Sequence, residues 1–196
     1  MEDCKVYDTV SSDNSSRYST NIQLRNNSGG TFTYDSNGYY IGKITSSTSG
    51  ETGFQISPLD GITTDLKIEF DGYMKQVISS YSRPSTLGIG VYLDSNNFYM
   101  LKGDGSSHCY WIGKKVNGSY SENNTSSSIF NENEWIHYEC TIQGTTMTMV
   151  ATNSSNQSVT WSQTIPTRAT GVKYCFPITW QTNAVWWVKN IKIKAL

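Results

Sequence analysis

The feature that most constrains the fold of this sequence is a regular alternation of apolar and polar residues between Trp135 and Ile142. Successive Cβ atoms of a β-strand point to opposite faces, so this period of two predicts a strand with one buried face. A turn follows around Gly144, because glycine reaches positive φ without steric cost. The segment Thr146–Val150 then predicts a return strand, with Met147 and Met149 on one face. We therefore predict a β-hairpin here, with Cys140 as a buried free thiol.

Further strand patterns recur along the chain at the spacing typical of β-sandwiches, and no window shows helical periodicity. The clearest are Leu66–Phe70, Leu87–Leu93, Phe98–Leu101, His108–Lys114 and Val159–Ile165. The segment 116–128 is predicted to be a polar loop. Near the C-terminus, alternate residues from Val172 to Trp180, including Ile178, are predicted to share one strongly apolar face. These patterns predict a single β-sandwich domain over residues 1–196.

The last residues, WWVKNIKIKAL, add a strand in which Ile191 and Ile193 alternate with polar residues. The Glu134–Ala151 hairpin and the Trp187–Ile193 strand together resemble the concanavalin A-like (laminin G-like) jelly-roll superfamily. The resemblance implies an all-β fold, a two-sheet antiparallel jelly-roll sandwich. It selects no single function, because the superfamily holds lectins, carbohydrate-binding modules, glycoside hydrolases, lyases and spacer domains.

Aromatic residues are unusually frequent. They make up 13% of the chain, with six Trp and thirteen Tyr, although the whole hydrophobic fraction is only 36%. One sandwich core does not need so many rings, so we expect some of them at the surface. Ser, Thr and Asn supply about a third of the residues. Both an extracellular surface and an AT-rich genome would produce this composition, and the sequence leaves the two explanations open.

The formal net charge of −1 and the lack of a basic run argue against a nucleic-acid partner. No apolar run has the length needed for membrane insertion. The start, MEDCKVYD, lacks the features of a signal peptide. We expect a cytosolic chain, a piece of a larger exported protein, or a virion component, and favour an extracellular, cell-surface or virion location.

The four cysteines, Cys4, Cys109, Cys140 and Cys175, lie far apart and show no zinc-binding spacing. Disulfides joining Cys4 to Cys175 or Cys109 to Cys175 stay open as alternatives, although unpaired cysteines are favoured. The superfamily resemblance also implies a structural calcium site, for which Asp3, Asp8 and Asn190 would supply oxygen ligands. The spacing of these three residues does not require such a site, and no other cofactor is predicted.

Catalytic patterns are incomplete in this sequence. Glu69 and Asp71 could face one side of a sheet, but the third acid of the E-x-D-x-x-E pattern of related hydrolases is missing. His137 follows Trp-Ile, so the Gln-x-His motif of lyases with a similar fold is absent. His108 stands alone. We therefore predict that the chain is not an enzyme and has no catalytic residues.

Carbohydrate binding is the function that the residues favour once catalysis is set aside. The CH faces of sugars stack on aromatic rings, while amides and carboxylates hydrogen-bond sugar hydroxyls. Gly88 and Gly90 are predicted to leave a trough on one strand face, with Tyr92 and Asp94 at its end. Close packing of the strand is the alternative explanation for these glycines.

Further candidate ligand-binding residues are Asn97, Tyr99, Trp111 and Trp186, with Lys102 nearby in sequence. Trp186 is expected to point outward because it has the opposite parity to Trp187, Ile191 and Ile193. For each ring considered separately, a place in the core is the competing interpretation.

These observations predict a non-catalytic carbohydrate-binding module that recognises a cell-surface glycan, as in a phage tail or fibre or an adhesin. One alternative is a structural spacer or oligomerisation domain that contacts other subunits of a virion or surface assembly. A second alternative is a polysaccharide hydrolase or lyase of the same fold.

Overall fold

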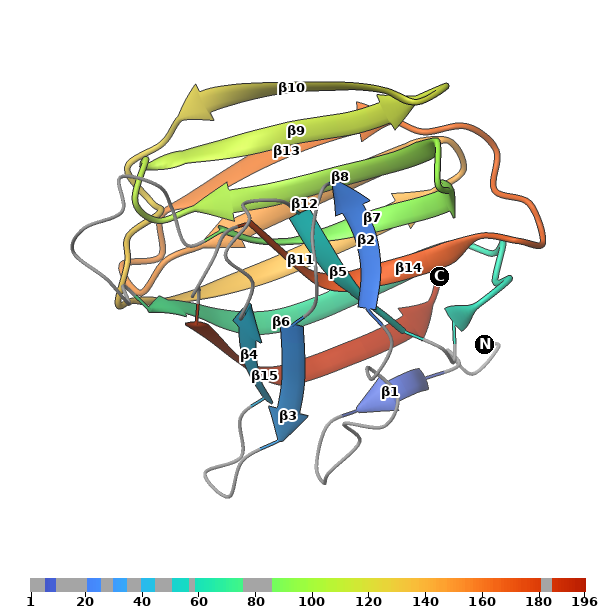
Figure 1. Cartoon of the computed structure of the whole chain (residues 1–196). Coiled ribbons are helices and arrows are strands. Elements are labelled where there is room, and N and C mark those ends of the chain that lie inside the picture. The colour runs from blue at the N-terminus through green and yellow to red at the C-terminus, as the bar shows by residue number, and fades with distance from the viewer. Residues whose placement is uncertain are drawn as a thin grey trace.

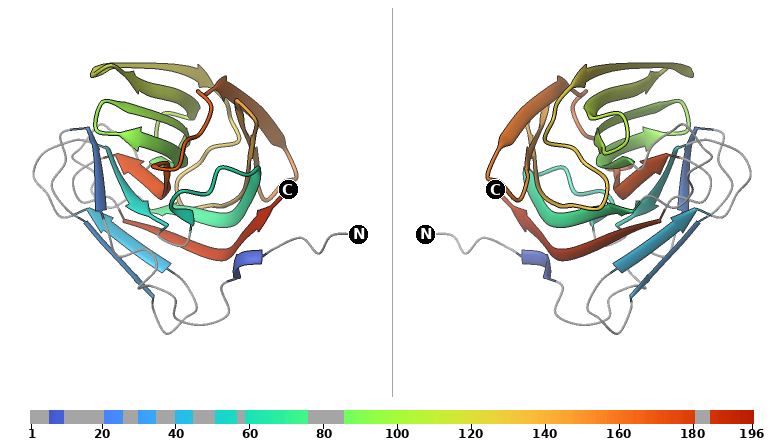
Figure 2. Two further views of the ribbon diagram at one scale, coloured as in Figure 1. Left: turned by 90° about the vertical axis from the view of Figure 1, so that its right-hand side faces the viewer. Right: turned by 90° about the vertical axis from the view of Figure 1, so that its left-hand side faces the viewer.

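The computed structural model describes residues 6–9, 21–25, 30–34, 40–44, 51–56, 59–75, 86–180 and 185–196, which form two antiparallel β-sheets packed face to face (Figures 1 and 2). The first strands are β1 (Val6–Thr9), β2 (Asn21–Arg25), β3 (Gly30–Tyr34), β4 (Tyr40–Ile44) and β5 (Glu51–Gln55). They are followed by β6 (Leu66–Lys75), β7 (Thr86–Asp94), β8 (Asn97–Asp104), β9 (Cys109–Val116) and β10 (Ser119–Ser126). The last are β11 (Trp135–Gln143), β12 (Thr146–Thr152), β13 (Ser158–Thr164), β14 (Lys173–Trp180) and β15 (Val185–Ala195).

One sheet has eight strands in the order β13-β12-β11-β6-β15-β4-β3, with β1 paired beside β15. The other has seven strands in the order β10-β9-β8-β7-β14-β5-β2. The chain crosses repeatedly between the sheets, so strands far apart in sequence become neighbours, as β6 and β15 do. This arrangement confirms the predicted all-β, two-sheet antiparallel sandwich.

The predicted hairpin is present as β11 and β12, joined by a turn at Gly144, whose φ is +54°. Ile136, Tyr138, Cys140 and Ile142 all point inward and are fully buried. Their alternation with half-buried or exposed neighbours fixes which face of β11 meets the other sheet.

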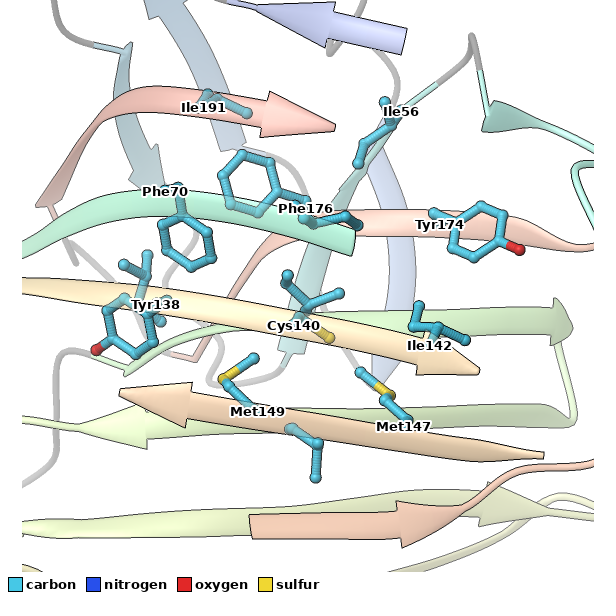
Figure 3. Packing of buried hydrophobic residues seen from close by; sticks show 14 of the residues in the cluster. Ile56, Phe70, Tyr138, Cys140, Ile142, Met147, Met149, Tyr174, Phe176 and Ile191 are labelled. Atoms are coloured by element: carbon cyan, nitrogen blue, oxygen red, sulfur yellow. The ribbon is translucent and has the colours of Figure 1, made fainter. Parts of the chain in front are cut away.

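The two sheets meet through a core of aromatic and aliphatic side chains from their facing surfaces (Figure 3). The ring of Phe70 on β6 stacks on Tyr138 of β11, with centroids 4.8 Å apart. Phe70 also contacts Phe176 of β14 in the opposite sheet, with ring centroids 4.6 Å apart in an edge-to-face arrangement. Aromatic pairs in these geometries stabilise a core beyond their buried area, so Phe70 is a central contact between the layers.

A β-bulge on β15 makes the predicted orientation of Trp186 wrong. Before the bulge Trp186 and Val188 point inward, and after it Ile191 and Ile193 do, all at 0% exposure. The register against β6 shifts between Lys189 and Lys192, where Asn190 adopts a positive φ of 54°. One extra residue reverses the parity of a strand, so the alternation of the isoleucines could not be extended back to the tryptophans.

A second bulge, between Cys175 and Ile178 on β14, corrects the prediction of one apolar face from Val172 to Trp180. Val172, Tyr174 and Phe176 join the main core. Ile178 instead packs with Cys175 in a separate cluster on the outer face of the seven-stranded sheet, together with Phe98 and Met100. The side chain of Trp180 lies outside the described residues.

The prediction of a loop over residues 116–128 is also wrong, because Ser119–Ser126 forms β10 and pairs along its whole length with β9. As an edge strand, β10 is held by backbone hydrogen bonds on one side and exposes most of its side chains. Its sequence therefore carries little apolar periodicity, which was the signal used for the other strands.

Cys109, Cys140 and Cys175 are free and buried, which confirms the buried thiol at Cys140 and excludes a disulfide between Cys109 and Cys175. Cys4 and Asp3 lie outside the described residues, so the disulfide and the calcium site that involve them stay predictions. The described part of the chain contains no helix with the length and hydropathy of a membrane-spanning segment.

Gly42 provides a test of this packing, because the buried indole of Trp186 lies directly over it. A Cβ at position 42 would be 1.4 Å from Cη2 of Trp186, so Gly42→Ala should lower the free energy of unfolding by about 1–3 kcal/mol through overpacking. Urea denaturation measures this change. The matched control is Gly171→Ala, where no atom lies within 4 Å of the added Cβ. Equal stability of the two variants would contradict the buried position of Trp186.

Candidate functional site

Tyr92 and Trp111, two of the predicted site residues, lie on the outer face of the seven-stranded sheet, the face turned away from the main core. Tyr92 is half-buried and packs beside Phe98 at one end of this face. Trp111 is also half-buried and stands on β9, opposite Lys102 of β8 and Asn124 of β10. The structure thus places the two rings on one face but at different positions along the strands.

Asp94 and Asn97 lie at the β7–β8 turn and hold that turn together. The Asp94 carboxylate accepts hydrogen bonds from the Asn96 N–H at 2.7 Å and from Nδ2 of Asn97 at 3.0 Å. The bond from Asn97 is the main cause of the lowered pKa of Asp94. Oδ1 of Asn97 accepts the Asn117 N–H at 3.0 Å and so ties this turn to the β9–β10 turn. These contacts give both residues a structural role.

Tyr99 and Trp186 do not form exposed platforms. Tyr99 is only 9% exposed and belongs to the main core, because it alternates with the outward Phe98 and Met100. Trp186 is 0% exposed because of the parity shift on β15. The structure separates these two rings from the face that carries Tyr92 and Trp111.

The trough predicted along Gly88 and Gly90 is filled, so the alternative of close packing is correct. An added Cβ at Gly88 would lie 2.5 Å from Cβ of Lys102, and one at Gly90 would lie 2.4 Å from Cδ1 of Ile178. Neighbouring side chains therefore lie over both glycines and leave no groove there.

Trp111 is held in place by buried polar groups. Its indole N–H donates to Oδ2 of Asp104 at 3.0 Å, and Nζ of Lys102 lies 5.6 Å from its ring centroid. Burial raises the pKa of the fully buried Asp104, although hydrogen bonds from Ser107 and Trp111 oppose the rise. Lys102 is 2% exposed, and its Nζ lies 3.8 Å from Oε2 of Glu122. The indole is consequently oriented before any ligand arrives.

An open hollow of about 500 Å³ lies at the same end of the sheet. Its lining consists of Ser107, His108, Ser126, Ser127, Ser128 and Asn131, all of them polar. Asp104 connects it to Trp111, because the carboxylate that accepts the indole N–H also accepts the Ser107 N–H at 2.9 Å. Ser126 and Trp111 project from neighbouring strands on the same face.

His108 presents a hydrogen-bond acceptor at this hollow. Nδ1 lies 2.7 Å from the carbonyl oxygen of Phe130, and since a carbonyl can only accept, Nδ1 carries the proton. In the neutral ring Nε2 is therefore unprotonated and accepts. The exposed ring, with the four serine hydroxyls and the Asn131 amide, offers both donors and acceptors.

The outer face of the eight-stranded sheet carries a feature that the sequence did not predict. Trp135, Tyr73 and Trp187 are direct neighbours across β11, β6 and β15, and all three are half-buried. We call these three residues the aromatic row. The outward parity of Trp135 was visible in the sequence, but the pairing register that aligns the rings was not.

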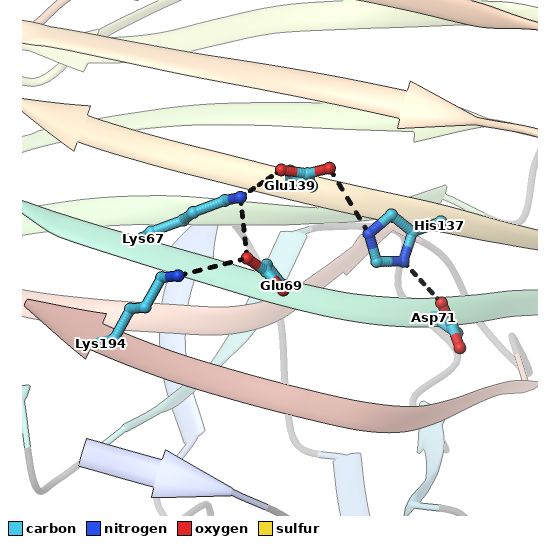
Figure 4. Close-up of polar contacts among 6 residues, drawn as sticks. All are labelled: Lys67, Glu69, Asp71, His137, Glu139 and Lys194. Atoms are coloured by element: carbon cyan, nitrogen blue, oxygen red, sulfur yellow. Dashed lines mark hydrogen bonds and ion pairs between the residues drawn. The ribbon is translucent and has the colours of Figure 1, made fainter. Parts of the chain in front are cut away.

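The two acids considered for catalysis also face outward on this sheet, and both are engaged (Figure 4). Glu69 pairs with Lys67 at 2.8 Å and with Lys194 at 3.9 Å. Asp71 contacts Nδ1 of His137 at 2.7 Å and accepts a hydrogen bond from Nδ2 of Asn190 at 2.6 Å. Asn190, proposed as a calcium ligand, thus directs its amide nitrogen to Asp71.

No protein-family model and no curated protein sequence matches this chain. Among solved structures, lectin II from Ulex europaeus matches with a TM-score of 0.59 at 13% identity, covering 93% of this chain and 99% of the lectin. The carbohydrate-binding module CBM66 from Bacillus subtilis gives 0.52 at 14%, covering 89% and 95%. An alginate lyase from Klebsiella pneumoniae gives 0.56 at 9%, covering 87% and 86%. These similarities show the fold, which is the concanavalin A-like jelly roll.

The Glu69 ion pairs predict a pH-dependent contribution to stability. The hydrogen bond from Lys67 lowers the pKa of Glu69, so the stabilisation is complete above the unfolded pKa and is lost as the pH falls through the lowered folded pKa. Glu69→Gln should reduce the free energy of unfolding by about 0.5–1 kcal/mol at pH 7. The difference from wild type should vanish at pH values below the folded pKa. Urea denaturation of wild type and Glu69→Gln at pH 7 and below the folded pKa measures the difference in their free energy of unfolding. A difference that does not change with pH would contradict the ionic origin.

Proposed function

We propose that this chain is a non-catalytic carbohydrate-binding module whose site is the hollow beside Trp111. The observation that carries the proposal is the pairing of an open, hydroxyl-rich hollow with a half-buried, oriented indole. The volume of the hollow, about 500 Å³, lies within the range of small-molecule sites.

The lining chemistry suits a neutral sugar. Serine hydroxyls and the Asn131 amide both donate and accept, as sugar hydroxyls do, and Nε2 of His108 accepts. The indole of Trp111 supplies the apolar surface on which a pyranose ring stacks. Because Asp104 and Lys102 already fix this indole, binding needs little further ordering of its side chain.

Sugar binding also occurs among proteins of this fold. The structures that match this chain include a lectin and a module named for carbohydrate binding, as well as a lyase named for alginate. They make carbohydrate a reasonable ligand class, whereas the choice between binding and catalysis depends on the residues of this chain.

Those residues favour binding without catalysis. The described lining of the hollow contains no carboxylate, and Asp104 behind it is fully buried and occupied by the Ser107 and Trp111 N–H groups. Glu134, which contacts Asn131, has a pKa lowered mainly by its hydrogen bond with Ser154. A glycosidase needs a general acid whose pKa is raised and which reaches the leaving group.

The biological setting that we propose is recognition of a cell-surface glycan by a phage tail or fibre or by an adhesin. The surplus of aromatic residues, the near-neutral charge and the Ser/Thr/Asn-rich composition support this setting. If the chain is instead a spacer or oligomerisation domain, no glycan will bind and the chain will self-associate in analytical ultracentrifugation.

A glycan array followed by calorimetric titration of the best neutral glycan tests the proposal. Ser126→Trp, which fills the hollow from an exposed position, and Trp111→Ala should each weaken binding at least tenfold, equivalent to about 1.4 kcal/mol. The matched control, Trp135→Ala, removes a half-buried indole from the other sheet and should bind as wild type does.

Two results would overturn this function. One is unchanged affinity in both hollow variants, which would place the sugar elsewhere. The other is release of new reducing or unsaturated ends from the bound glycan, which would make the protein a hydrolase or a lyase.

A further inference from the structure

The strand β13 forms one edge of the eight-stranded sheet. All seven of its residues pair with β12 without a register shift, and no described strand pairs with its other side. Trp161 fixes this edge from inside, because its side chain is 4% exposed and stacks on Tyr110 of the opposite sheet with ring centroids 5.0 Å apart. The edge is therefore a regular and firmly held template for another strand.

Alternate residues of β13 turn their backbone groups toward the open edge. At one end of the strand the Asn153 N–H donates to the Gln157 oxygen, and at the other end the Ile165 N–H donates to the Thr145 oxygen. Hydrogen-bonded pairs recur at every second residue, so the odd-numbered residues of β13 bond to β12. The N–H and C=O groups that face the edge belong to four exposed residues, Ser158, Thr160, Ser162 and Thr164.

This edge lacks the features that usually prevent one strand from pairing with another. Exposed edges of natural sheets carry lysines, prolines or bulges. Although 16% of all residues are charged, the chain has no charged residue between Cys140 and Thr167. The strand β13 itself contains no proline, and its pairing with β12 shows no bulge. Nothing in the strand would therefore repel an identical strand.

The strand is also complementary to itself in the antiparallel direction. Backbone bonds form across the edge only where two edge-facing residues are opposed, and the register with complete overlap is centred on Trp161. That register opposes Ser158 to Thr164 and Thr160 to Ser162. Every outward side chain then meets a hydroxyl, and such cross-strand pairs stabilise a sheet.

We propose that β13 binds a second copy of this chain, with the two β13 strands antiparallel about a twofold axis at Trp161. The axis is perpendicular to the sheet, so the two eight-stranded sheets join into one continuous sheet. Each copy uses the same edge, so association ends at the dimer. Because one short strand from each copy makes a small contact, the dimer forms in a concentration-dependent way.

This symmetry places both hollows on one side of the dimer. An axis perpendicular to the joined sheets keeps the two seven-stranded sheets, each with its own Trp111, on the same side of the assembly. Two sites on one side bind a glycan-coated surface together, which raises the overall affinity without new contacts. This consequence rests on the function proposed above, whereas the dimer does not.

Sedimentation velocity of the full chain over a range of concentrations tests the dimer. Wild type should change from monomer to dimer as the concentration rises. The variant Thr160→Lys/Ser162→Lys opposes lysine to lysine across the axis, so the dissociation constant of the dimer should rise at least tenfold. The variant Thr160→Lys/Ser162→Glu changes the same exposed positions but opposes lysine to glutamate, so it should dimerise at least as tightly as wild type.

The matched control Ser119→Lys/Ser121→Lys adds two lysines at exposed positions of β10 and should dimerise as wild type does. Wild type that stays monomeric at the highest concentration would overturn the proposal. Equal dimerisation of the two β13 variants, or wild-type species larger than a dimer, would also overturn it. Failure of wild type to bind any glycan would instead remove the proposed function and leave the dimer intact.

Discussion

Phe70 joins the two layers of this protein, because its ring stacks on Tyr138 within its own sheet and meets the edge of Phe176 from the other. Its inward position fixes the parity of β6, and the register with β11 and β15 then fixes the parity of the strands on either side. Each residue that the core places inside determines which neighbours face solvent. The chemistry of both outer faces is therefore a consequence of core packing.

The two outer faces that result differ in character. On the seven-stranded sheet, buried Asp104 and Lys102 orient one indole beside a neutral hollow lined by serines. On the eight-stranded sheet, three half-buried rings stand side by side with lysines over both ends. Hydrogen-bonding groups characterise the first face, whereas ring–ring and lysine–ring contacts characterise the second.

The sequence predicted the layered all-β fold because period-two alternation is a local property, and β11 shows it without interruption. Trp111, one of the rings predicted to bind ligand, lies half-buried on the outer face of the seven-stranded sheet. The sequence-based prediction failed where one extra residue reverses parity, at Asn190 on β15 and between Cys175 and Ile178 on β14. It missed β10, whose backbone pairing with β9 leaves little apolar pattern.

Site assembly was less predictable than the fold. The aromatic row depends on the register among β11, β6 and β15, and the hollow depends on how the β8–β9 turn meets the residues after β10. Both are contacts between segments distant in sequence, which periodicity cannot supply. Tyr99 and Trp186 were predicted to bind ligand but lie in the core, because aromatic content alone could not distinguish core rings from exposed ones.

The proposed ligand site is the hollow next to Trp111, occupied by a sugar. Its most direct test is a two-dimensional ¹H–¹⁵N NMR titration of labelled protein with a neutral oligosaccharide selected on the glycan array. The Trp111 indole N–H and the backbone amides from Ser126 to Ser128 should shift, while the β12 and β13 amides stay unchanged. Shifts confined to another part of the molecule, with the Trp111 indole N–H unmoved at saturation, would contradict it.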